Sequence, residues 1–123
     1  MKVLVVDDED DIRRVARLAL GRVGGMEVVD TGRSEEATDL AAREKPDAIL
    51  LDVMMPELDG PGTLAALRAD ARTAAIPVVF LTAKAMPAEI QRLRALGAAG
   101  VLTKPFDPMT LAAALRGILG TLP

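Results

Sequence analysis

The sequence contains no cysteine, no histidine, no tryptophan and no tyrosine, and its only aromatic residues are two phenylalanines. Without cysteine or histidine the chain has no disulfide, no thiolate or imidazole zinc site and no histidine general base. With so few aromatic side chains it has almost nothing on which unpaired bases could stack, which argues against binding to single-stranded nucleic acid. Carboxylates, hydroxyls and amines remain as the groups that can carry chemistry.

The chain also lacks an excess of basic residues and long apolar runs. It has 15 Lys and Arg against 18 Asp and Glu, a net charge of −3, and no basic stripe, so we expect no direct contact with DNA. The apolar run at 3–6 is too short for a signal peptide, and no stretch approaches the length of a membrane span. We therefore predict one cytoplasmic domain over residues 1–123, with an aliphatic core and no membrane contact.

Short aliphatic runs alternate along the chain with segments of helical period. Most of the runs are apolar without alternation, as expected of strands covered on both faces, and we predict strands at 2–6, 26–29, 48–51, 78–81 and 100–102. Helices are expected near 12–21, 34–45, 61–69, 86–97 and 108–119. Ser34 is the expected N-cap of the second helix, and Pro87 suits the first turn of the fourth. Such βα units in series predict an α/β fold with a doubly wound, five-stranded parallel sheet.

Polar side chains follow four of the five predicted strands: Asp7 and Asp8, Asp52, Thr82, and Lys104. Ligands of open parallel sheets bind outside the carboxyl ends of the strands, so we expect these side chains to gather at one edge. Carboxylates without cysteine or histidine suit Mg²⁺, while a lysine and a hydroxyl suit phosphate oxygens. The grouping predicts a phosphoryl-transfer site, with Asp52 as the nucleophile and Asp7 and Asp8 as metal ligands.

Asp7 and Asp8 begin a run of five consecutive acids at 7–11. Two carboxylates about 4 Å apart repel by roughly 4 kcal/mol at an effective dielectric of about 20, so such a run needs water or a cation among its members. We assign the first two acids to the metal pocket. Glu9, Asp10 and Asp11 are expected to begin the first helix, where the helix dipole favours negative charge.

Four segments resemble, in order and spacing, the signature segments of response-regulator receiver domains: VLVVDDEDDIR, ILLDVMMPELDG, VVFLTAK and GVLTKPFDP. The resemblance covers the whole chain and implies the flavodoxin-like strand order 2-1-3-4-5. It implies that Asp52 is the phosphoacceptor. The Mg²⁺ ligands that it implies are Asp7, Asp8, Asp52 and the backbone carbonyl of Met54.

The same resemblance assigns two further roles and the partners. Thr82 would be the switch hydroxyl and Lys104 the phosphate-binding lysine, and the Lys104–Pro105 peptide bond is expected to be cis. Members of the family take the phosphoryl group from a phosphohistidine of a sensor histidine kinase or a histidine phosphotransfer protein, and lose it by attack of water. We therefore expect a domain that catalyses only its own phosphorylation and dephosphorylation, and that relays the signal to a downstream protein.

Two features bear on how a signal would leave the domain. Val101 stands where the family usually has Tyr or Phe, which weakens the usual conformational route from Thr82 to the surface. Receivers of the family that dimerise use the face formed by the fourth helix, the fifth strand and the fifth helix, and they choose their partner by opposite charges across it. The stretch 97–101, which precedes and begins the fifth strand, carries no charge. We therefore predict a monomer that passes phosphate or docks through the rim of the site.

The surface of the first helix offers a weaker signal. Arg13, Arg14 and Arg17 are interpreted as a solvated face rather than a docking patch. Leu18 falls off the apolar stripe, beside Arg14, and is a candidate contact for the phosphodonor protein. The six Met residues are interpreted as core filler.

Three alternatives accompany this interpretation. A Mg²⁺-dependent phosphatase of the haloacid dehalogenase type also uses an Asp nucleophile. Those enzymes carry a D-x-D motif on the first strand and a substrate-gating cap. Here the first strand is followed by Asp7-Asp8, Asp52 belongs to the third strand, and no segment is long enough for a cap. A pseudo-receiver that binds a partner without phosphorylation would lack the acceptor or the lysine, and both Asp52 and Lys104 are present. We expect a stand-alone regulator, with a piece of a hybrid kinase or larger regulator as the alternative.

Overall fold

A computed structural model describes residues 1–84 and 86–122. Five parallel strands form one sheet in the order β2-β1-β3-β4-β5, which confirms the predicted α/β, flavodoxin-like topology. The strands are β1 (Lys2–Val6), β2 (Glu27–Thr31), β3 (Ala48–Asp52), β4 (Val78–Thr82) and β5 (Gly100–Thr103). Each predicted strand is therefore present, with its bounds shifted by at most two residues.

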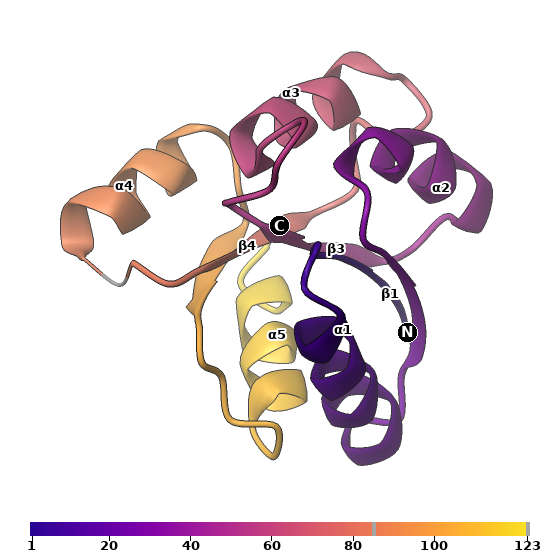
Figure 1. Ribbon diagram of the computed structural model, residues 1–123, viewed down its shortest axis with the longest axis vertical. Coiled ribbons are helices and arrows are strands. Elements are labelled where there is room, and N and C mark those ends of the chain that lie inside the picture. The colour runs from indigo at the N-terminus through magenta and orange to yellow at the C-terminus, as the bar shows by residue number, and fades with distance from the viewer. Residues whose placement is uncertain (85, 123) are drawn as a thin grey trace.

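Helices cover both faces of this sheet (Figure 1). They are α1 (Asp10–Arg17), which continues as the π-helical segment η1 (Leu18–Val23), the 3₁₀ turn η2 (Ser34–Glu36), α2 (Ala37–Glu44), α3 (Gly60–Ala69), α4 (Pro87–Ala95) and α5 (Leu111–Leu119). Helices α1 and α5 lie on one face, and α2, α3 and α4 lie on the other. Among the described residues, no helix combines the length and the apolar character needed to cross a membrane.

The two core layers follow from the alternation of side chains along the strands. Every residue of β3 and β4 is buried, because neighbouring side chains point to opposite faces and both faces are covered. Leu4 and Phe80 pack toward α2, α3 and α4. Val5 and Leu81 pack toward α1 and α5. The aliphatic runs that predicted the strands thus supply both layers at once.

Several helix ends differ from the sequence-based predictions. Ser34 is not an N-cap: it is the first residue of η2, and its Oγ accepts a hydrogen bond from the Leu58 N–H at 3.2 Å. Helix α5 begins at Leu111 rather than at Pro108. The expected end of α4 near Gly97 is confirmed, since this glycine has a φ of 104° that a side chain would strain.

The interpretation of the methionines as core filler is wrong for most of them. Met26 and Met55 are buried, but four others are more than half exposed: Met1, Met54, Met86 and Met109. The exposed ones lie at the amino terminus or in loops, where no second layer covers them. A flexible apolar side chain can fill a core, but composition does not tell where the chain places it.

Candidate functional site

The strand register brings the first two candidate residues together. Val6 pairs with Leu51 across β1 and β3, so the residues that follow, Asp7 and Asp52, end neighbouring strands at the same level. Asp8 comes next in the turn toward α1. Oxygen atoms of Asp7, Asp8 and Asp52 lie within 4.8 Å of one another. The predicted acidic pocket is therefore present as a cluster.

The three carboxylates differ in their access to solvent. Asp7 is 0% exposed and Asp52 is 3% exposed, whereas Asp8 is an exposed residue. Two buried carboxylates this close oppose each other strongly, because little water screens them. The cluster therefore needs positive charge from the chain or from a bound cation.

Lys104 supplies part of this charge. Its Nζ lies 2.7 Å from Asp7 Oδ2 and 3.2 Å from Asp52 Oδ1. Its backbone N–H donates to the Thr82 carbonyl at 2.8 Å, and the Lys104–Pro105 bond is cis, as predicted. The structure thus brings the lysine to both buried carboxylates from the opposite side of β3.

Burial and charge shift the proton affinities of this cluster. Burial, and then the negative charge of Asp7, raise the pKa of Asp52 to about 6, although Lys104 acts in the opposite direction. Burial alone would lower the pKa of Lys104, but its two carboxylate partners outweigh that effect and raise it. The lysine therefore stays charged at neutral pH, while Asp52 carries its charge at an energetic cost.

The oxygen atoms of the cluster fit a divalent cation. Asp7 Oδ1 accepts a hydrogen bond from the Glu9 N–H at 2.9 Å. Asp7 Oδ2 is buried, and within the described chain it has the lysine ammonium nearby but no hydrogen bond of good geometry. Asp52 Oδ1 accepts one long hydrogen bond, 3.4 Å, from the Met54 N–H, besides its contact with the Lys104 ammonium at 3.2 Å. Hard oxygen ligands with spare lone pairs suit Mg²⁺, so Asp7, Asp8 and Asp52 could hold this ion.

Thr82 lies at the same edge of the sheet. It ends β4, one residue beyond the pairing of Asp52 with Leu81, and it is buried. Its Oγ1 accepts a hydrogen bond from the Lys84 N–H at 3.0 Å. The structure thus brings together the candidate acids, hydroxyl and lysine, while the role of each, and that of the Met54 carbonyl, stays a prediction.

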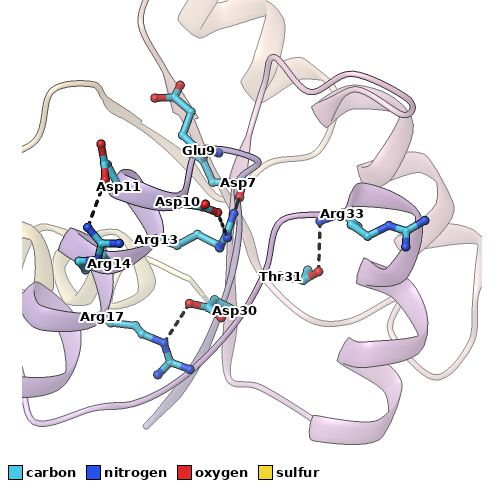
Figure 2. A network of polar contacts seen from close by, with 10 residues as sticks. All are labelled: Asp7, Glu9, Asp10, Asp11, Arg13, Arg14, Arg17, Asp30, Thr31 and Arg33. Atoms are coloured by element: carbon cyan, nitrogen blue, oxygen red, sulfur yellow. Dashed lines mark hydrogen bonds and ion pairs between the residues drawn. The ribbon is translucent and has the colours of Figure 1, made fainter.

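The sequence reasoning missed one residue at this site. The interpretation of Arg13 as part of a solvated face is wrong: its side chain is only 19% exposed and its Nη1 donates to the Asp7 carbonyl at 2.6 Å (Figure 2). Arg14 and Arg17, with side chains 72% and 51% exposed, do lie at the surface. The spacing of Asp10 and Arg13, which pair on one helix turn, was the only local signal, and it does not indicate the contact with Asp7.

Comparisons with known proteins show the family of the chain. Residues 3–116 match the family described as response regulator receiver domain. A Rhizobium etli protein named "Probable chemotaxis protein CheY" is 33% identical over 122 residues, which cover 99% of this chain and 95% of that protein. The chemotaxis response regulator CheY4 of Vibrio cholerae superimposes with a TM-score of 0.87 at 35% identity, covering 95% of this chain and 97% of that one.

Other relatives are longer. "Probable transcriptional regulator ycf27" of Cyanophora paradoxa is 42% identical over 118 residues, covering 96% of this chain but 48% of that protein. The chain spans about half the length of the first of the curated relatives it matches.

The chain belongs to the response regulator receiver domain family. It is a receiver domain of two-component signalling, and such domains are signalling modules rather than classical enzymes. This confirms the fold and the family that the sequence motifs implied.

Proposed function

We propose that this receiver accepts a phosphoryl group on Asp52 from a phosphohistidine of a sensor histidine kinase or histidine phosphotransfer protein. Asp7, Asp8 and Asp52 would hold Mg²⁺, together with the Met54 carbonyl, and Lys104 would bind the phosphoryl group. The observation that carries the proposal is the cluster itself: three carboxylates within 4.8 Å, with an ammonium 3.2 Å from the acceptor. A structural role alone does not account for two buried acids placed side by side.

The transfer would be an in-line displacement at phosphorus. A carboxylate oxygen of Asp52 forms the new P–O bond as the P–N bond to the donor histidine breaks, and the electron pair stays on the imidazole. Bound Mg²⁺ would supply charge neutralisation between the acids and the phosphoryl oxygens. Lys104 already reaches Asp52, so it needs only a short movement to donate to a phosphoryl oxygen, and the Thr82 hydroxyl would donate to another.

A separate hydrolysis step would restore the free carboxylate of Asp52. Water attacks the phosphorus in line, the P–O bond to Asp52 breaks, and phosphate leaves. The domain would therefore catalyse only changes to its own side chain. A haloacid dehalogenase type phosphatase would place its nucleophile on the first strand, whereas here Asp52 ends β3.

The donor protein would approach over α1 and η1. Leu18 is 49% exposed at the junction of these two segments and follows Arg14 by one helical turn. An exposed leucine beside an exposed arginine suits an apolar contact with a charged border. Leu18→Ala should slow transfer from a phosphorylated phosphotransfer protein while leaving labelling by acetyl phosphate unchanged; equal slowing of both would remove this contact from the proposal.

The proposal includes a cytoplasmic monomer that passes its phosphoryl group on or docks through the rim of the site. It is supported by Val101, which is half-buried against the core and offers no aromatic ring to turn. Light scattering with and without beryllofluoride, which mimics the phosphoryl group on Asp52, tests it. A shift to dimer at micromolar concentration would contradict it.

The central experiment is phosphorylation by acetyl phosphate with Mg²⁺, followed by intact-mass analysis. The wild-type domain should gain one phosphoryl group, and Asp52→Asn should gain none, because an amide is a far weaker nucleophile and metal ligand. Asp70→Asn, which changes a surface carboxylate far from the cluster, is the control and should label normally. Stoichiometric labelling of Asp52→Asn would refute the acceptor, and an unlabelled wild type would favour a phosphorylation-independent pseudo-receiver.

A further inference from the structure

Arg13 links α1 to the acidic pocket through the backbone rather than through a carboxylate of the cluster. Its Nη1 donates to the Asp7 carbonyl at 2.6 Å, while its Nη2 pairs with the Asp10 carboxylate. Figure 2 shows the guanidinium lying between the start of α1 and the turn at Asp7. The planar guanidinium of Arg13 is thus held at both ends of the acidic turn, by the Asp7 carbonyl and by the Asp10 carboxylate.

The contact replaces a missing backbone hydrogen bond of the β1–β2 ladder. The Asp7 N–H donates to the Thr31 carbonyl at 3.1 Å, which continues the pairing of β1 with β2. In a parallel ladder the next rung would run from the Arg33 N–H to the Asp7 carbonyl. The Arg33 N–H instead donates to Thr31 Oγ1 at 3.1 Å. The Asp7 carbonyl therefore loses its strand partner at the residue where the metal ligands begin, and Arg13 takes that place.

Gly32 provides the space for this arrangement. A Cβ at this position would lie 2.6 Å from Arg13 Nη1 and 3.1 Å from its Cζ. Such a contact cannot form, so even an alanine here would displace the guanidinium. Gly32 has no positive φ in the structure, so a side chain here would disturb the seat of the Arg13 guanidinium rather than the backbone.

The position of this turn determines the geometry of the acids. Asp7 Oδ1 is fixed by the Glu9 N–H at 2.9 Å, which directs Oδ2 toward Lys104. Asp8 lies between Asp7 and Glu9, outside any strand or helix. A shift of the Asp7 carbonyl would therefore move both carboxylates relative to Asp52.

We propose that Arg13 is a positioning residue: by replacing the missing rung, it holds the Asp7–Asp8 turn at the geometry that binds the divalent cation beside Asp52. This inference rests on the proposed function, since it assumes that the cluster binds Mg²⁺. The proposed role of Arg13 does not include contact with the phosphoryl group.

The test measures the Mg²⁺ dissociation constant by titration calorimetry of the complete chain, well below its melting temperature. Arg13→Ala should weaken Mg²⁺ binding by about tenfold, as is usual when a group that orients metal ligands is lost. Arg13→Lys should recover part of the affinity, because one ammonium can reach the Asp7 carbonyl without the fork. An affinity within about twofold of wild type for Arg13→Ala would overturn the proposal.

Arg68 offers a matched control. It too is a partly buried arginine whose guanidinium donates to backbone carbonyls, those of Ala74 at 3.1 Å and Ile76 at 2.7 Å. These carbonyls precede β4, at the opposite edge of the sheet. Arg68→Ala should lower the melting temperature but leave Mg²⁺ affinity unchanged. If it weakens Mg²⁺ binding as much as Arg13→Ala does, the effect is general destabilisation and the proposal fails.

Gly32→Ala keeps the arginine but displaces it, which provides a test that does not need Arg13→Ala to fold. It should weaken Mg²⁺ binding in the wild-type background. In an Arg13→Ala background it should cause no further loss, because the two changes act through one contact. Equal effects in both backgrounds, or none in the first, would overturn the proposal.

The wild-type titration separates this inference from the proposed function. A wild type that binds no Mg²⁺ overturns both. A wild type that binds Mg²⁺ and is labelled on Asp52, with Arg13→Ala unaltered, overturns the positioning role alone. Normal Mg²⁺ binding that depends on Arg13, with label retained in Asp52→Asn, supports the positioning role and removes the phosphoacceptor.

Discussion

Carboxylates in two regions of this domain lie in opposite surroundings. At the carboxyl edge of the sheet, Asp7 and Asp52 are buried side by side and share one ammonium, that of Lys104. In the loop between α3 and β4, Asp70 accepts hydrogen bonds from the Arg72 N–H at 2.9 Å, its Nε at 3.1 Å and its Nη2 at 2.7 Å. The loop satisfies its carboxylate completely, while the edge of the sheet leaves its acids short of positive charge.

The pKa values express this difference with opposite signs. Hydrogen bonds from Arg72 lower the pKa of Asp70 to about 2, whereas burial and the charge of Asp7 raise the pKa of Asp52 to about 6. A lowered pKa means that the charged carboxylate contributes to folding, and a raised one means that it opposes folding. Asp52, whose charge opposes folding, is the acid for which we propose a function. A carboxylate that lacks positive charge around it can gain that charge from a bound ligand, and Asp70 already has it from Arg72.

Removing Lys104 should have the largest effect. In Mg²⁺-free buffer, Lys104→Met should lower the free energy of unfolding by about 3 kcal/mol, as expected when a buried ion pair loses one partner. Lys84→Met, which changes an exposed lysine near the same edge, is the control and should cost little. Urea denaturation measures both. A loss no larger than that of the control would mean that the acids are not held together by this lysine.

Mg²⁺ should supply the positive charge that the cluster lacks. At about 100 times its dissociation constant, binding to the folded state alone should stabilise the wild type by about 2.7 kcal/mol, visible as a higher melting temperature. Asp8→Ala should abolish this response, and Asp70→Asn should keep it. Equal responses of wild type and Asp8→Ala would place the ion elsewhere.

Neutralising Asp52 should stabilise the metal-free protein. Its folded-state pKa of about 6 lies above the ordinary value of 3.8, so its charge causes a loss of stability that grows as pH rises from about 4 to about 6. Asp52→Asn removes this loss and should raise the free energy of unfolding by on the order of 1 kcal/mol at neutral pH. The variant should also flatten the pH dependence between those values. A destabilised variant at neutral pH would contradict the sign.

The same change in the loop should have the opposite sign and the smallest size. The pKa of Asp70 is lowered, so its contribution to stability is present above about pH 4 and is lost as pH falls toward 2. Asp70→Asn should lower the melting temperature slightly at neutral pH, because exposed ion pairs contribute little. The difference from wild type should disappear in acid. Stabilisation by Asp70→Asn would remove the contrast between the two regions.

The clustering of side chains at the carboxyl edge of the sheet could be predicted from the sequence because the fold is regular there. The uninterrupted aliphatic runs before Asp7, Asp52 and Thr82 predict buried parallel strands, and such strands end at a common edge. The surface was harder to predict. The exposure of Met54, Met86 and Met109 depends on which loops lack a covering layer, and no periodicity records that.

The sheet and the identity of the residues gathered at its carboxyl edge could be predicted from the sequence alone, because hydrophobic period and strand-end residues are local features of the chain. Three contacts follow from tertiary packing alone: the sharing of Lys104 between Asp7 and Asp52, the hydrogen bond from the Leu58 N–H to Ser34 Oγ, and the close packing of Arg13 against Gly32. Each of these depends on the distance and rotation at which one element docks on another. Those quantities come from packing the whole core, and no local stretch of sequence contains them.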